Sequence, residues 1–141
     1  MKIKTNELTG AALDLAVAMA IGCEVVFIHE HFSQIARLSG WSEGKIAEYL
    51  AKMDNYPCSL DRVGNPRPIP SYSTDYSRGC PIIDQEKIDT KWDRVVWLAN
   101  SRWVQDEERV YMYGPTRLIA AMRCYVASRL GDEVEVPDEL V

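Results

Sequence analysis

Positive charge is scarce in this chain: 16 lysines and arginines stand against 21 aspartates and glutamates, which gives a formal net charge of −5. Broad affinity for nucleic acid or for an anionic membrane depends on a basic surface that releases counterions. The charge balance therefore argues against both as general targets, although it leaves a local basic patch open. DNA stays a partner that the net charge disfavours.

Long apolar runs are also missing. No stretch approaches the roughly 18 to 20 consecutive apolar residues that cross a bilayer. Residues 11–21 are the most apolar part of the N-terminal region, but they contain Asp14 and follow Glu7. A buried helix explains this stretch better than a signal peptide does. We therefore expect no membrane association.

Cysteine and histidine are few, and neither forms a motif. The four cysteines lie far apart without a Cys-x-x-Cys pair, so reduced thiols in a cytosol are expected. The only histidines, His29 and His31, would share one side of a strand and could hold a metal with a third ligand. Zinc sites usually show more ligands at motif spacing, so we favour surface or helix-capping histidines and predict no metal and no cofactor. Glycine-rich phosphate loops and a Gly-x-Ser-x-Gly elbow are absent, and no catalytic residue is predicted.

The most informative stretch that is present spans residues 114–131. Pro115 suits the first turn of a helix, and Gly131 suits a left-handed stop at its end. Between them, apolar side chains recur on one broad face and small residues fill most of the remaining circumference. A helix of this kind belongs in the middle of a domain, so we predict a core helix over residues 115–130.

The rest of the chain predicts elements that cover this helix. Thr9 and Gly22 bound a second apolar helix over residues 10–21, and residues 54–80 are expected to be irregular. Strands are expected at 1–4, 23–28, 88–92, 94–99, 102–113 (with 109–113 as its firm part) and 133–136, with a turn at Asn100-Ser101. Helices and strands do not alternate regularly, which favours an α+β fold. We predict a single domain over residues 1–141, with a small, mostly antiparallel sheet packed against two apolar helices and a helical-hairpin insertion at about 29–60.

Residues 34–50 have the spacing of a helix-turn-helix unit. Ala36 allows two helices to approach, Gly40 makes the turn, Ser42 caps the second helix, and Ile46 and Tyr49 pack back. The second helix, however, presents two glutamates where DNA would place phosphates, which opposes binding. A hairpin used for packing or partner contact is therefore preferred over a DNA-reading unit.

Residues 71–79 are the best candidate binding surface. They combine hydroxyls, a carboxylate, two phenols and a guanidinium, a mixture able to stack on a planar group and bond its polar edges. Tryptophans at strand-like positions, Trp92, Trp97 and Trp103, could line a pocket beside this run or could simply fill the core. An Asx or Ser turn that needs no ligand is the competing interpretation of the run. The candidate ligand-binding residues are Tyr72, Ser73, Asp75, Tyr76, Arg78 and Trp92.

Three blocks of the sequence together resemble the NinX-like proteins of tailed bacteriophages and prophages, a family of unknown function. The blocks are Glu7-Leu8-Thr9-Gly10-Ala11-Ala12-Leu13-Asp14, residues 73–83, and the stretch from Gly114 to Ser128 with Gly131-Asp132. Cys80 and Arg117 stand where the family pattern often has a second glycine and a second proline. The resemblance implies a bacterial host cytoplasm as the location, and it supplies no catalytic residue.

These observations lead to one preferred hypothesis and two alternatives. We expect a phage accessory protein without catalytic activity that binds a host or phage protein, or a small ligand such as a nucleotide, through residues 71–79 and neighbouring aromatics. The alternatives are a helix-turn-helix DNA-binding regulator that uses residues 33–50, and a small enzyme in which Asp75, Arg78 and a histidine converge. The ligand and the oligomeric state, including a homo-oligomer, stay open.

Overall fold

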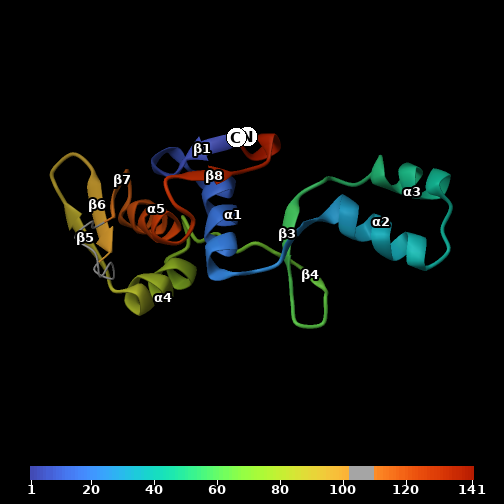
Figure 1. Cartoon of the computed structure of the whole chain (residues 1–141), viewed down its shortest axis with the longest axis horizontal. Coiled ribbons are helices and arrows are strands. Elements are labelled where there is room, and N and C mark those ends of the chain that lie inside the picture. Colours follow the sequence, from blue (N-terminus) through green and yellow to red (C-terminus); the bar gives the residue numbers. More distant parts are fainter. Residues whose placement is uncertain (102–109) are drawn as a thin grey trace. The chain divides into compact units, whose positions relative to one another are not determined.

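A computed structural model describes residues 1–101 and 110–141. The chain divides into two compact units: residues 1–22 with 70–141 form the first, and residues 23–69 form the second (Figure 1). The fold class is α+β, as predicted, and the strands form three small antiparallel sheets. The expected strand residues 102–109, which include Trp103, lie outside the described part.

Two apolar helices form the centre of the first unit. α1 (Gly10–Ile21) has the predicted bounds and ends at Gly22, whose φ of 95° is left-handed. α5 (Arg117–Leu130) begins after Thr116, whose hydroxyl accepts the backbone N–H three residues further on at 3.1 Å. Pro115 therefore precedes the helix and does not open its first turn as predicted, because the threonine hydroxyl provides the cap.

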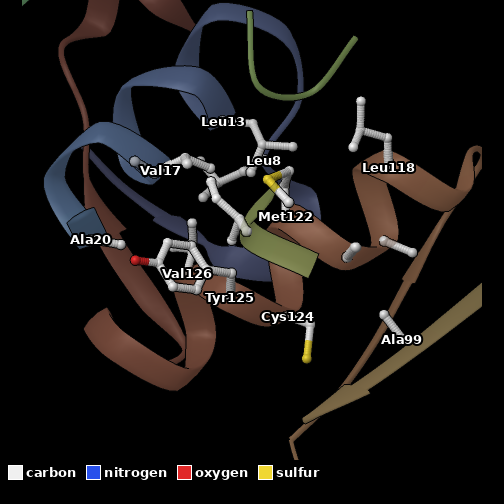
Figure 2. Packing of buried hydrophobic residues seen from close by; sticks show 14 of the residues in the cluster. Leu8, Leu13, Val17, Ala20, Ala99, Leu118, Met122, Cys124, Tyr125 and Val126 are labelled. Atoms are coloured by element: carbon white, nitrogen blue, oxygen red, sulfur yellow. The ribbon is translucent and has the colours of Figure 1, made fainter. Parts of the chain in front are cut away.

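The apolar faces of α1 and α5 pack against each other, which confirms that the two helices share one core. Figure 2 shows Leu13 and Val17 of α1 beside Met122 and Val126 of α5, with Leu8 nearby. Every side chain of α5 from residue 120 to residue 127 is buried. Burying a large apolar side chain such as Met122 or Val126 stabilises the fold by about 1.5 to 3 kcal/mol.

A three-stranded antiparallel sheet packs on α5, and Cys124 and Ala99 lie on this side of the helix (Figures 1 and 2). The small size of Ala99 allows the sheet to approach the helix closely. The strands are β5 (Ile88–Trp92), β6 (Trp97–Ser101) and β7 (Tyr111–Gly114), in the order β5, β6, β7.

The turn between β5 and β6 begins at Asp93. The turn predicted at Asn100-Ser101, between strands at 94–99 and 102–113, is wrong because both residues lie in β6. The Asp93 carboxylate accepts the N–H groups of Val95 and Val96 at 2.9 and 2.8 Å, which satisfies the backbone of the turn. Asn100 and Ser101 instead pair with β5 inside the sheet. The Asn-Ser dipeptide was therefore a misleading turn signal.

A helix that the sequence did not predict, α4 (Tyr76–Glu86), follows Asp75 and contains Pro81. The predicted irregular segment 54–80 thus ends in a helix. Ile82 and Ile83 carry α4 onto the core around α5. This burial outweighs the loss of one helical hydrogen bond at the proline.

The ends of the described chain pair with each other. β1 (Lys2–Lys4) and β8 (Glu133–Glu135) form an antiparallel ladder, as the extended segments at 1–4 and 133–136 predicted. Short 3₁₀ helices follow each strand, η1 (Thr5–Glu7) and η2 (Asp138–Leu140).

Arg123 of α5 is buried, and within residues 1–101 and 110–141 it pairs with no acidic side chain, although a nearby acid was the expected partner. Its Nε donates to the carbonyl of Leu8 at 2.8 Å, and Nη1 donates to the carbonyl of Tyr113 at 2.7 Å. Burial lowers the pKa of this guanidinium. One side chain therefore joins the start of α1, the end of β7 and α5.

The second unit contains the predicted helical hairpin, formed by α2 (Ile28–Leu38) and α3 (Glu43–Leu50). Gly40 adopts a left-handed φ of 85° in the turn, and the Ser42 hydroxyl caps α3, as predicted. A small antiparallel sheet that was only partly predicted completes the unit, with β2 (Val25–Phe27), β3 (Pro57–Leu60) and β4 (Pro66–Pro68).

Among the described residues, no helix has the length and apolar character needed to cross a membrane.

Candidate functional site

The candidate surface at residues 71–79 is a turn that leads into a helix and not a continuous flexible run. The carbonyl of Ser71 accepts the N–H groups of Thr74 and Asp75 at 3.2 and 2.8 Å, which closes the turn. α4 then begins at Tyr76. The prediction of an irregular run is therefore wrong for residues 76–79, although the expected Asx-type chemistry is present.

Asp75 provides that chemistry at the N-cap of α4. Its Oδ1 accepts the Ser77 hydroxyl at 2.7 Å and the Ser77 N–H at 3.0 Å. These bonds, from the hydroxyl first and then the amide, lower the pKa of Asp75 and keep the exposed carboxylate ionised at neutral pH. The side chain thus fixes the backbone direction at which α4 leaves the turn.

Asp14, a residue that sequence reasoning did not connect with this segment, anchors the turn to α1. Asp14 Oδ1 accepts the N–H of Ser73 at 2.8 Å, and the Ser73 side chain is only 2% exposed. Burial raises the pKa of Asp14 more than the bond from Ser73 lowers it. A lone carboxylate on an otherwise apolar helix was the only signal in the sequence, and it does not reveal a contact 59 residues away.

The six candidate residues therefore have different environments. Tyr76 is 49% exposed, and Arg78, two residues further along the first turn of α4, is also exposed. Tyr72 is half-buried and packs against the core, and Ser73 is buried. Only the start of α4 presents large side chains of this segment to solvent.

Trp92 lies at the end of β5 that is remote from α4, because the whole strand separates it from Ile88. Trp92 is 48% exposed and faces Trp97 across the hairpin, with ring centroids 5.7 Å apart. The pair caps the end of the sheet. No described contact joins these tryptophans to residues 71–79, so a shared pocket stays a prediction.

A pocket does exist in the first unit, but it lies at the other end of α4. Its volume is about 450 Å³, and it is bounded by the C-terminal end of α4, the start of β5 and the first residue of α5. The described residues that line it are Ile83, Asp84, Lys87, Ile88, Asp89 and Arg117.

The helical hairpin of the second unit uses most of its charged side chains internally. Arg37 donates to both carboxylate oxygens of Glu43, at 2.7 and 3.2 Å, and Lys45 lies 4.0 Å from the centroid of the Trp41 ring. Phe32 stacks on Tyr49 where the two helices meet, and Trp41 packs edge-to-face against both rings. Tyr49 therefore packs back on the first helix as predicted, and this geometry is that of a stable packing hairpin.

The two histidines lie on α2 and not on a strand, because the helix begins at Ile28. His29 Nε2 is 2.8 Å from the carbonyl of Met53, so this ring joins the start of α2 to the chain after α3. Within residues 1–101 and 110–141, no group of three histidine, cysteine or acidic side chains is arranged to hold a metal ion.

Comparison with known proteins identifies the family of the chain. No curated protein matches the chain. A family model described as "Bacteriophage P22, NinX" matches residues 4–129, which include both core helices, the turn at 71–79 and the hairpin unit. The match covers most of the 141 residues and confirms the resemblance. The chain therefore belongs to the NinX family of bacteriophage proteins.

Proposed function

We propose that this phage accessory protein has no catalytic activity and binds a host or phage protein in the bacterial cytoplasm through the start of α4. The observation that carries the proposal is the exposure of Tyr76 and Arg78 together on a backbone that is fixed at both sides. Tyrosine and arginine are among the side chains that most often supply binding energy at protein interfaces.

The fixed backbone matters because ordering a loop on binding costs affinity. The bond from Ser73 to Asp14 attaches the turn to α1, and the Asp75 cap fixes the first turn of α4. Tyr76 and Arg78 are therefore presented on a preorganised support. Only their own side chains remain to be ordered when a partner binds.

The positions of the two side chains favour a protein over a small planar ligand. Residues two apart on an α-helix project in directions that differ by about 200° and do not face each other. Tyr76 and Arg78 cannot easily clamp one aromatic ring between them, whereas a protein surface can contact both. A nucleotide-like ligand is therefore the second choice at this surface.

The enzyme alternative fits the chemistry less well. Asp75 would have to act as a base, but its pKa is lowered by two bonds from Ser77, which makes it a weak proton acceptor. His29 and His31 belong to the second unit, while Asp75 and Arg78 belong to the first.

The DNA-binding alternative rests on the hairpin, whose two helices and glycine turn have the expected spacing. The cations there are engaged by Glu43 and by the Trp41 ring, which reduces the charge left for phosphates. A gel shift with mixed-sequence duplex DNA at low salt tests this alternative. Binding at micromolar protein would revive it.

The interface proposal is tested with the full chain carrying both Y76A and R78A. A matched control carries Y56A and R62A, which remove the same residue types from exposed positions in the second unit. We expect crosslinking and mass spectrometry in infected cells to identify a protein that is captured by wild type and control but lost from Y76A/R78A. W92A, made separately, shows whether the surface extends to the end of the sheet.

Thermal melting of wild type and of both double variants shows whether each variant is folded. The melting temperatures should agree, because all of the replaced side chains are exposed. Equal capture of the same protein by wild type and by Y76A/R78A would overturn the proposal. It would also be overturned if no protein is captured by both wild type and the Y56A/R62A control.

A further inference from the structure

The pocket at the C-terminal end of α4 combines an apolar floor with a charged rim. Ile83 and Ile88 are buried, at 4% and 7% exposure, and supply apolar surface. Lys87 and Arg117 supply two positive charges, and Asp84 and Asp89 also line the pocket. Its volume of about 450 Å³ lies within the range typical of small-molecule sites.

A hydrogen bond to Thr90 of β5 holds the Arg117 side chain in place, which favours recognition of an anion. Its Nε donates to the Thr90 hydroxyl at 2.8 Å, which holds the guanidinium plane. Nη1 and Nη2 form no hydrogen bond with a described residue, and the edge that they make matches the two oxygens of a carboxylate. Arg117 is also the first residue of α5, where the partial positive charge of the helix favours an anion.

Lys87 occupies a strained backbone position. It terminates α4 with φ of 54° and ψ of 42°, in the left-handed region where glycine is the usual residue. Among the described residues, only Arg94 is a second non-glycine residue with positive φ. Such strain is often retained where a side chain has a functional task. The ammonium of Lys87 forms no ion pair with a described residue, although Asp84 is one helical turn away.

We propose that this pocket binds a small organic carboxylate with an apolar body. Arg117 and Lys87 bind the carboxylate, and the hydrocarbon part covers Ile83 and Ile88. The Asp84 carboxylate in the lining repels a multiply charged phosphate more strongly than a singly charged carboxylate, which makes a single negative charge the better match. The carboxylate is supplied either by a free organic acid or by the C-terminus of a peptide that ends in an apolar residue.

This site is distinct from the surface proposed above, because it lies at the opposite end of α4. Its test is therefore independent of the capture experiment. A negative result for the pocket leaves the proposed interface at the start of α4 standing, and the reverse also holds.

The test uses 4-methylpentanoate as the probe and the full-length protein, with binding followed by NMR chemical-shift changes. We expect saturable shifts at Lys87, Ile88 and Arg117, and none from the neutral 4-methylpentanamide. N-acetylleucine distinguishes the two sources: tighter binding than 4-methylpentanoate indicates a peptide C-terminus, and weaker binding indicates a free acid.

K87G and R117Q should each weaken binding of 4-methylpentanoate by about tenfold or more, since each removes a charge-assisted contact. K87G should at the same time raise the melting temperature, because glycine relieves the strained backbone. R94G is the matched control: it also removes one positive charge at a left-handed position, but far from the pocket, and should leave binding unchanged. An affinity unaffected by K87G, or tighter binding of inorganic phosphate than of 4-methylpentanoate, overturns the proposal.

Discussion

The backbone amide of Ser73 donates a 2.8 Å hydrogen bond to the carboxylate of Asp14, joining the turn before α4 to the apolar helix α1. Burial raises the pKa of Asp14, so the native state binds its proton more tightly than the unfolded chain does. Ionised Asp14 therefore reduces the free energy of unfolding at neutral pH. This cost is absent below the unfolded-state value of 3.8 and develops as the pH rises through the raised native pKa.

D14N should consequently be at least as stable as wild type at pH 7, because an amide oxygen still accepts the Ser73 N–H without the buried charge. The difference between D14N and wild type should shrink as the pH falls toward 4. D14A loses the acceptor and should be less stable than D14N by about 1 to 2 kcal/mol. Urea unfolding across this pH range measures all three, and a D14N variant less stable than D14A would contradict the assignment.

Arg123 should be a major determinant of stability, because its two hydrogen bonds satisfy carbonyls in distant segments. R123M leaves the carbonyl oxygens of Leu8 and Tyr113 without this donor and should cost roughly 2 to 4 kcal/mol. R129M is the control, since the half-exposed Arg129 pairs with Glu86 at 2.8 Å and such a pair contributes about 1 kcal/mol or less. If R123M and R129M lose equal stability in urea unfolding, the two hydrogen bonds of Arg123 contribute no more than an exposed ion pair.

The sequence predicted the elements whose signals are local. The Gly22 stop of α1, the Gly40 turn and the Ser42 cap follow from short-range backbone chemistry, and all are present. Thr9 precedes α1 as predicted, but its side chain makes no capping hydrogen bond. α4 was missed because Gly79 and Pro81 are usual breakers of a helix, and only packing on α5 compensates for them. The hairpin of β3 and β4 was missed for a similar reason, since prolines occupy its strands.

The candidate site shows the same division between local and long-range information. Asp75 was identified with a turn role that the structure retains. The burial of Ser73, by contrast, depends on α1, and the pocket at Lys87 and Arg117 depends on three elements that meet only in the folded chain. The residue types within one stretch do not predict contacts between elements that are far apart in the sequence.

Gly79 should tolerate no larger side chain. A Cβ at this position would overlap Cδ1 of Leu118 and lie 2.8 Å from the carbonyl oxygen of Tyr72. The leucine can move, but the backbone oxygen cannot, so G79A should lose about 1 to 3 kcal/mol. G44A is the matched control in α3, where a Cβ meets nothing within 4 Å, and it should be neutral or more stable by up to about 1 kcal/mol. Thermal unfolding of both variants tests the contrast.

Cys124 should be the least reactive of the four free thiols. Burial raises its pKa to about 12, and its side chain is 0% exposed between α5 and the sheet. Cys23 and Cys80 are partly exposed and should react first. Iodoacetamide at pH 8, followed by peptide mass spectrometry, should label Cys124 only after denaturant is added. Rapid labelling of the folded protein would indicate that the sheet separates readily from α5.

The dependence of α1 on α5 has a consequence for synthesis of the protein. α1 buries its apolar surface against α5, which is synthesised roughly 100 residues later, whereas the elements of the hairpin unit follow one another within residues 23–69. The newly made chain must therefore carry an uncovered apolar helix until α5 has been synthesised. Premature termination before residue 117 should yield aggregated material that host chaperones retain.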